Sequence, residues 1–245
     1  MTIALCTAAV LVAALVKGAI GFGFPTLSTP LLSLVTDVHT AVVLLIAPNI
    51  AMDAIQFGRR GAPLAVARRF APLLLAGGVG TVIGTRLLVG LPPRVAGMVL
   101  SATILLYVLS SLVGFAPRVA PGWEAWASPV VGLVVGVIGG ITNVPGTPLV
   151  MYFRALGLDK NTFISATAFT FIVYKLVQLG AVAYYGLVTW PIVAGSAGLT
   201  ALALGGFAVG LRVQDRLEPR AFNRAVLGFL AVVGAWLLWR SLGAR

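Results

Sequence analysis

The sequence predicts an all-α membrane protein built from two similar halves, and three observations lead to this prediction. Of the 245 residues, 60% are hydrophobic and only 9% are charged, whereas a soluble domain carries about a quarter charged residues. Apolar stretches of about 20 residues, which is enough for a helix to cross a bilayer, recur along the whole chain. A pattern of Gly, Thr and Pro also occurs twice, once from Gly18 and once from Gly136.

Composition argues against several other classes of protein. The apolar stretches lack the alternation of apolar and polar residues that is typical of a transmembrane β-barrel. The net charge is +11, but the arginines lie between apolar stretches, so we assign them to membrane orientation and expect no nucleic-acid partner. The single cysteine, Cys6, excludes an internal disulfide and a Cys-rich metal site. We therefore expect neither a bound metal nor a cofactor.

The repeated pattern is G-x-I-G-x7-T-P-L, which runs from Gly18 to Leu31 and again from Gly136 to Leu149. After a four-residue insertion the similarity continues, because Asp37 matches Asp159. The same offset places Asp53 opposite Lys175, and Gln56 opposite Gln178. We expect one integral membrane domain with a first repeat over 1–113, a linker over 114–128 and a second repeat over 129–245.

Each half is expected to contain one interrupted helical element followed by three uninterrupted membrane spans. Gly and Pro cause the interruptions, since proline lacks an N–H and glycine adopts conformations closed to other residues. In the first half the interrupted element covers 2–35 and the spans cover 38–57, 70–89 and 95–113. In the second half the interrupted element covers 129–156 and the spans cover 162–186, 190–210 and 222–241.

The distribution of Lys and Arg indicates how the interrupted elements enter the membrane. If each element crosses once, 7 of these residues fall inside and 8 outside, which is no bias. If both elements are re-entrant hairpins, 11 fall inside and 4 outside, in agreement with the positive-inside rule. We therefore predict two inverted repeats in a bacterial inner (cell) membrane, with both termini outside.

The two interruptions are the predicted substrate site. Non-helical backbone at membrane depth must be buried in protein or line a wet cavity. A helix that begins there directs free N–H groups and its positive dipole end toward the cavity, which suits an anion. The expected substrate-binding residues are Gly21, Phe22, Gly23, Phe24, Pro25, Thr26, Ser28 and Thr29 at the first break and Gly139, Gly140, Thr142, Asn143, Gly146 and Thr147 at the second. A plainer interpretation is that the glycines serve close helix packing and the prolines only bend helices.

Charged residues within the predicted spans also indicate a substrate site at the two interruptions. Lys17 precedes the first break, Lys175 lies in mid-span, and Asp53 occupies the position that matches Lys175. Such residues are costly in a bilayer and are usually functional. We assign Lys17 and Lys175 to substrate binding and Asp53 to coupling or to an ion pair. Gln56 and Gln178 could donate hydrogen bonds to an oxyanion or could hold helices together.

The breaks also carry a resemblance to a known family. The sequences G-A-I-G-F-G-F-P-T-L-S-T-P-L-L at 18–32 and G-V-I-G-G-I-T-N-V-P-G-T-P-L-V at 136–150 resemble the sulfite exporter TauE/SafE family, also called the toluene-sulfonate uptake permease family. The resemblance implies export or uptake of sulfite, organosulfonates or related sulfur-containing or carboxylate anions. Proton coupling is often proposed for such transporters.

The sequence thus predicts a secondary transporter of a small anion that works by alternating access. An anion-selective channel is the alternative, because the same donors could line an open pore. We do not expect an enzyme, since the chain has no H-E-x-x-H motif, no nucleophile elbow and no P-loop. The expected partners are a small anionic substrate and the lipid bilayer, while proton coupling and a homodimer are left open.

Overall fold

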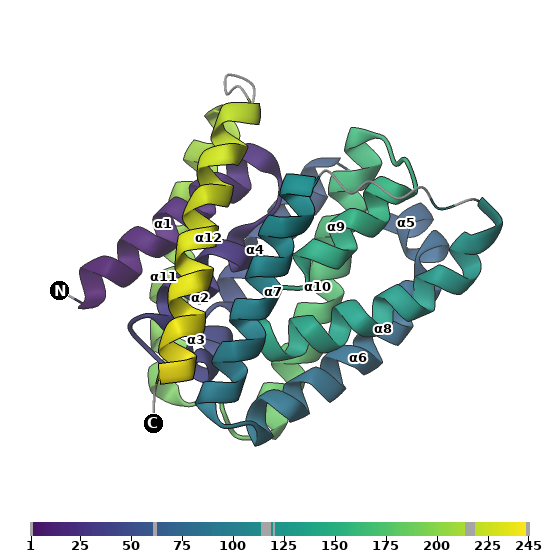
Figure 1. The fold of residues 1–245 in the computed structure, drawn as a ribbon. Coiled ribbons are helices and arrows are strands. Elements are labelled where there is room, and N and C mark those ends of the chain that lie inside the picture. Colours follow the sequence, from purple (N-terminus) through teal and green to yellow (C-terminus); the bar gives the residue numbers. More distant parts are fainter. Residues whose placement is uncertain (1, 61–62, 114–118, 120, 214–218, 244–245) are drawn as a thin grey trace.

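The computed structural model describes residues 2–60, 63–113, 119, 121–213 and 219–243, and all regular structure in these ranges is helical (Figure 1). Six of the described helical segments are long and apolar enough to cross a membrane. These segments are Val38–Arg59, Ala71–Gly90, Pro93–Ser110, Glu124–Thr142, Asn161–Tyr184 and Trp190–Arg212. The predicted class, an all-α membrane protein, is confirmed.

The elements follow the predicted order in both halves of the chain. The first half contains α1 (Thr2–Ile20), α2 (Phe24–Ser33), α3 (Val38–Leu44), α4 (Ile46–Arg60), α5 (Pro63–Arg69), α6 (Ala71–Gly90) and α7 (Pro93–Val113). The second half contains the 3-10 turn η1 (Pro121–Trp123), α8 (Glu124–Thr142), α9 (Gly146–Ala155), α10 (Lys160–Tyr184), α11 (Trp190–Val213) and α12 (Pro219–Gly243). Each interrupted element is thus a helix of 19 residues, a break and a helix of 10 residues.

The largest differences from the predicted element boundaries are found in three places. The span expected over 38–57 is divided at Leu45 into α3 and α4. The short helix α5 fills a segment that was expected to be a loop. Helix α8 begins at Glu124 rather than at 129, so the linker is shorter than predicted. An ion pair joins α5 to the first residue of α8, Glu124. The Arg69 guanidinium on α5 donates to both Glu124 carboxylate oxygens at 2.8 and 3.0 Å.

Glycines allow the first helix of each interrupted element to pack tightly against a span from the other half. Helix α8 lies along α6, and a Cβ on Gly140 would stand only 2.6 Å from the Thr81 carbonyl oxygen. Helix α1 lies along α11, and a Cβ on Gly206 would stand 2.7 Å from the Leu11 carbonyl oxygen. Small residues at such interfaces are typical of packing in membranes. Gly140 therefore lies in close contact with the backbone of α6.

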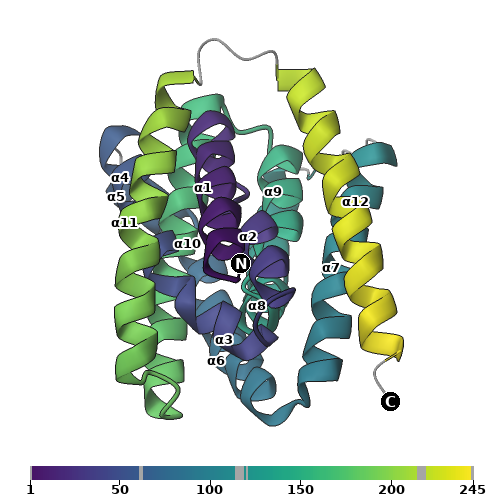
Figure 2. The same ribbon diagram turned by 90° about the vertical axis from the view of Figure 1, so that its left-hand side faces the viewer.

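Two pairs of matching spans, α4–α10 and α7–α12, pack against each other in antiparallel orientation. In the pair α7–α12, Arg94 near the start of α7 donates to the carbonyls of Ser241 and Leu242 near the end of α12. Figure 2 shows these two helices side by side at one edge, α11 at the other edge, and the broken helices between them. In the pair α4–α10, the rings of Phe57 and Phe169 stack with centroids 5.1 Å apart. Toward the opposite ends of these helices, Ile46 of α4 and Val182 of α10 belong to one apolar cluster.

Apolar side chains cover the outside of the helical bundle and polar ones lie inside it. Leu75 on α6 is 74% exposed and Leu106 on α7 is 61% exposed. In contrast, Lys17, Asp53 and Lys175 are each at most 1% exposed. A soluble protein shows the opposite arrangement. The helices therefore present an apolar surface to lipid and enclose their charges.

Candidate substrate-binding site

Two glycines in the left-handed region form the first break. Helix α1 ends at Ile20, and Gly21 and Gly23 follow with φ values of 95° and 99°. Side chains with a Cβ rarely adopt this conformation, which explains glycine at both positions. Helix α2 then begins at Phe24 with Pro25 in its first turn, where proline costs no hydrogen bond. The start of α2 is therefore directed into the interior of the bundle.

The second break uses an asparagine where the first uses glycine. Asn143, with φ of 65°, is the one non-glycine residue with positive φ within the described ranges, and asparagine tolerates this conformation better than most residues. The Thr142 hydroxyl donates to the Ile138 carbonyl at 2.7 Å and accepts from the Val144 N–H at 3.1 Å. Pro145 precedes α9, which begins at Gly146.

The two breaks meet inside the protein. The Asn143 side-chain amide donates to the Thr29 hydroxyl on α2 at 3.2 Å. A Cβ on Gly146 would lie 3.7 Å from the Thr26 hydroxyl oxygen. Residues more than 110 positions apart in the chain, 29 and 143, are thus in direct contact. The breaks form one continuous region of polar groups at the start of α2 and α9.

Lys17 is completely buried beside the first break, so it does not extend to a membrane surface. Its ammonium lies 2.7 Å from Oδ1 of Asp53 and donates to Oδ1 of Asn49 at 2.9 Å. Asn49 and Asp53 are both on α4, four residues apart, so they share one face of that helix. The ion pair joins α1 to α4.

Lys175 lies beside the second break and is 1% exposed. Its ammonium donates to Oδ1 of Asn143 and, at 2.6 Å, to Oε1 of Gln178. Asp53 interacts electrostatically with Lys175 as well as with Lys17. The structure therefore gathers the three charged residues that the sequence singled out into one buried cluster with one net positive charge.

The two matching glutamines make matching contacts. The Gln56 amide donates to the Gly21 carbonyl at 2.5 Å. The Gln178 amide donates to the carbonyls of Gly140 at 3.1 Å and Gly139 at 3.4 Å. Gly21 and Gly139 are equivalent in the repeated pattern. Each glutamine thus contacts carbonyl groups at the end of a broken helix, where carbonyl groups run out of helical N–H partners. The Gly139 carbonyl also accepts a hydrogen bond from the Asn143 N–H at 2.9 Å.

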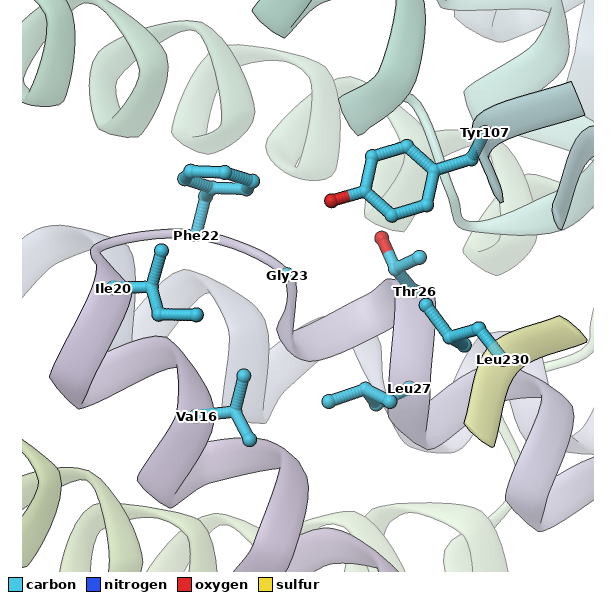
Figure 3. A pocket seen from close by; sticks show the side chains of 8 residues that line it. All are labelled: Val16, Ile20, Phe22, Gly23, Thr26, Leu27, Tyr107 and Leu230. Atoms are coloured by element: carbon cyan, nitrogen blue, oxygen red, sulfur yellow. The ribbon is translucent and has the colours of Figure 1, made fainter. Parts of the chain in front are cut away.

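A small hollow opens at the first break (Figure 3). Its empty volume is about 280 Å³, which includes space open to solvent. In Figure 3 the hydroxyl groups of Tyr107 and Thr26 face each other across the hollow, and Phe22 and Gly23 form its side at the break.

Ser28, Phe22 and Gly139, which were also predicted as site residues, make contacts within the protein at the breaks. The Ser28 hydroxyl donates to the Phe24 carbonyl at 2.7 Å. The Phe22 ring packs edge-on against Phe163, with centroids 6.2 Å apart. A Cβ on Gly139 would lie 2.8 Å from Cβ of Pro145. The side chain of Thr147 lies outside the described residues.

The sequence prediction missed three polar side chains near the breaks. Asn49 holds Lys17, and Tyr107 lines the hollow. Thr85 on α6 is fully buried, and its hydroxyl has no hydrogen-bond partner among the described residues. Its backbone N–H lies 2.7 Å from where a Cβ of Gly140 would be. Asn49 could have been found from its spacing of four residues from Asp53, whereas Thr85 and Tyr107 depend on tertiary contacts.

The apolar surface, the membrane-spanning helices and the enclosed charges define a multi-pass membrane protein. The model of the family described as "Sulfite exporter TauE/SafE" matches residues 6–237, so the chain belongs to this family of membrane transporters. The family that the two break sequences resembled is thereby confirmed. Neither the comparison with curated proteins nor the comparison with solved structures found a match.

Proposed function

We propose that this protein is a secondary transporter that carries a small anion, such as sulfite, an organosulfonate or a related sulfur-containing or carboxylate anion, across the cell membrane. The observation that carries the proposal is the pair of buried ammonium groups, Lys17 on α1 and Lys175 on α10, each beside one of the two breaks. An ammonium that costs several kcal/mol to bury is expected to have a functional reason.

The balance of charge supports an anionic substrate. Asp53 offsets one of the two lysines, and the pair Lys17–Asp53 is close, at 2.7 Å. Among the described residues, the hydrogen bonds of Lys175 go to the neutral oxygens of Asn143 and Gln178. A bound anion would neutralise the remaining positive charge and would accept hydrogen bonds from Lys175 and from N–H groups at the start of α2 and α9.

The arrangement of helices favours alternating access. We propose that residues 1–113 and 129–245 are inverted repeats, that both interrupted elements are re-entrant, and that both termini face outside. The antiparallel pairs α4–α10 and α7–α12 support the inversion, because each pair joins matching spans of the two halves. In transporters built this way, one repeat moves against the other around a fixed central site.

Flux measurements in proteoliposomes test the proposal. Wild-type protein should give saturable uptake of at least one labelled anion from a panel of sulfite, sulfate, taurine, sulfoacetate and simple carboxylates. Lys175→Gln should lower uptake at limiting substrate by roughly tenfold to a hundredfold, since a hydrogen bond to a charged group contributes about 1.5–3 kcal/mol. Lys160→Gln, at the first residue of the same helix, is the matched control and should transport normally.

Two results would contradict the proposal. Equal loss of flux in Lys160→Gln and Lys175→Gln would remove the special role of the buried ammonium. Uptake that does not saturate, together with single-channel conductance, would favour an anion-selective channel over a carrier.

A further inference from the structure

The repeat places residues of opposite charge at one pair of matching positions in the buried cluster. In the second half, the Lys175 ammonium donates to Oε1 of Gln178 at 2.6 Å. In the first half, Gln56 occupies the place of Gln178, but Asp53 occupies the place of Lys175. The acceptor oxygen of Gln56 therefore has an acidic neighbour on its own helix where that of Gln178 has an ammonium.

Two side-chain oxygens of α4 have no hydrogen-bond donor among the described residues, and Nδ2 of Asn49 on the same helix has no acceptor there. The Gln56 amide group is oriented by its hydrogen bond to the Gly21 carbonyl, which fixes Oε1 as the free end. Among the described residues, neither Oε1 of Gln56 nor Oδ2 of Asp53 has a hydrogen-bond partner. Gln56 is 4% exposed and Asp53 is 1% exposed. Asp53 and Gln56 are three residues apart and lie on one face of the helix.

A buried acceptor without a donor is unfavourable, and two adjacent acceptors are best satisfied by a hydrogen that they share. A metal cation would add a third positive charge beside Lys17 and Lys175, and no group of three His, Cys, Asp or Glu side chains that could hold one occurs in the described ranges. A proton needs no additional room and converts the carboxylate into a donor.

We propose that Asp53 and Gln56 form a proton-binding site. A proton taken from water forms an O–H bond at Oδ2 of Asp53, and this O–H group donates to Oε1 of Gln56. The carboxyl group becomes neutral, and its ion pair with Lys17 is lost. Protonated Asp53 thus donates a hydrogen bond to Oε1 of Gln56, as the Lys175 ammonium does to Oε1 of Gln178.

The neighbouring helices α1, α3, α10 and α11 determine which charges act on this site. Lys17 from α1 and Lys175 from α10 both interact electrostatically with Asp53. Helix α11, which also packs on α4, carries Arg212 as its one charged residue, near its far end. His39 on α3 is directed elsewhere, since its ring lies 2.6 Å from the Leu88 carbonyl.

Proton binding also changes the substrate that neutralises the cluster, and this consequence rests on the proposed function. With Asp53 ionised, the two lysines leave one positive charge, which a monovalent anion balances. With Asp53 protonated, they leave two, which a divalent anion balances. The site therefore couples the charge of the transported anion to the uptake of a proton.

Infrared spectroscopy of the purified full-length protein tests the proton site without any substrate. Only six carboxyl side chains occur in the chain, so the carbonyl bands of protonated carboxyl groups can be assigned by substitution. On acidification we expect a band that Asp53→Asn removes. Gln56→Leu should shift this band to higher frequency, because the protonated carboxyl loses its acceptor. Asp37→Asn, outside the membrane spans, should leave it unchanged.

Three results of these infrared measurements would overturn the proposed proton site. A spectrum that Asp53→Asn leaves unchanged would exclude Asp53 as the protonated group. A band that Gln56→Leu leaves at the same frequency would exclude the shared hydrogen bond, and this variant also tests the site if Asp53→Asn fails to fold. A band abolished by sodium but not by choline would show a metal-cation site instead. Stabilisation of the protein by anions is measured separately, so failure of the proton site and failure of anion transport give different results.

Discussion

Replacing Lys17 with methionine should strongly destabilise the protein, because it leaves Asp53 buried without its closest cation. Methionine keeps most of the volume of the lysine stem but removes the ammonium. The Asp53 carboxylate would then have no partner within hydrogen-bonding distance in the described part of the chain, apart from its longer-range attraction to Lys175.

The size of the effect follows from the distance and burial of the pair. At 2.7 Å, two unit charges attract by about 6 kcal/mol at an effective dielectric constant of about 20. Desolvation offsets much of this attraction, and removing one partner of a buried ion pair typically costs about 3–5 kcal/mol. The double variant Lys17→Met/Asp53→Asn removes both charges, so it should be more stable than Lys17→Met alone by about 2 kcal/mol.

Reversible unfolding in mixed micelles, with wild type, both single variants and the double variant, measures this cycle. The loss should be largest in Lys17→Met, and the second substitution should recover a large part of it. Equal free energies of unfolding for Lys17→Met and the double variant would refute the reasoning, because they would mean that the unpaired carboxylate carries no penalty.

Two further predictions concern helix packing and helix capping. Gly206→Ala should lower the free energy of unfolding by about 1–3 kcal/mol, because its Cβ would lie 2.7 Å from the Leu11 carbonyl oxygen. The control variant Gly205→Ala, with open space around it, should be neutral or slightly stabilising. Equal losses of stability in the two variants, measured by unfolding titrations, would exclude tight packing as the cause. Asp159 caps α10, and the side-chain hydrogen bond from Thr162, followed by backbone N–H groups, holds the pKa of the carboxyl below its usual value of 3.8. The stabilising effect of the Asp159 carboxylate should therefore be complete above about pH 4 and be lost as pH falls through the lowered pKa. A stability difference between wild type and Asp159→Asn that stays constant through this range would contradict a capping role for the carboxylate.

Much of the fold could be predicted because a membrane-spanning helix requires a long apolar stretch, which is visible in the sequence. Helix α6 was expected over 70–89 and runs over Ala71–Gly90, since a long apolar stretch between polar residues has few alternatives in a bilayer. The division of a predicted span at Leu45 and the early start of α8 at Glu124 could not be predicted. The start of α8 is accompanied by an ion pair with Arg69, 55 residues earlier in the chain.

The sequence identified the charged residues of the buried cluster better than their partners. Lys17, Asp53 and Lys175 stand out because charges inside apolar spans are rare. Asn49, the neutral partner of Lys17, does not stand out in the sequence, because asparagine in a helix has many possible roles. The role of Gln56 and Gln178 was left open between substrate and helix contacts, and their bonds to Gly21, Gly139 and Gly140 are contacts to broken helices.

Ligand binding at equilibrium tests the central claim most directly. A saturating anion from the sulfite, sulfonate and carboxylate panel should stabilise the purified wild-type protein by about 2.7 kcal/mol at 100 times its dissociation constant. We expect Lys175→Gln to lose this stabilisation at the same concentration and Lys160→Gln to keep it. The absence of stabilisation by every anion, or equal stabilisation of both variants, would contradict a buried anion site between the two breaks.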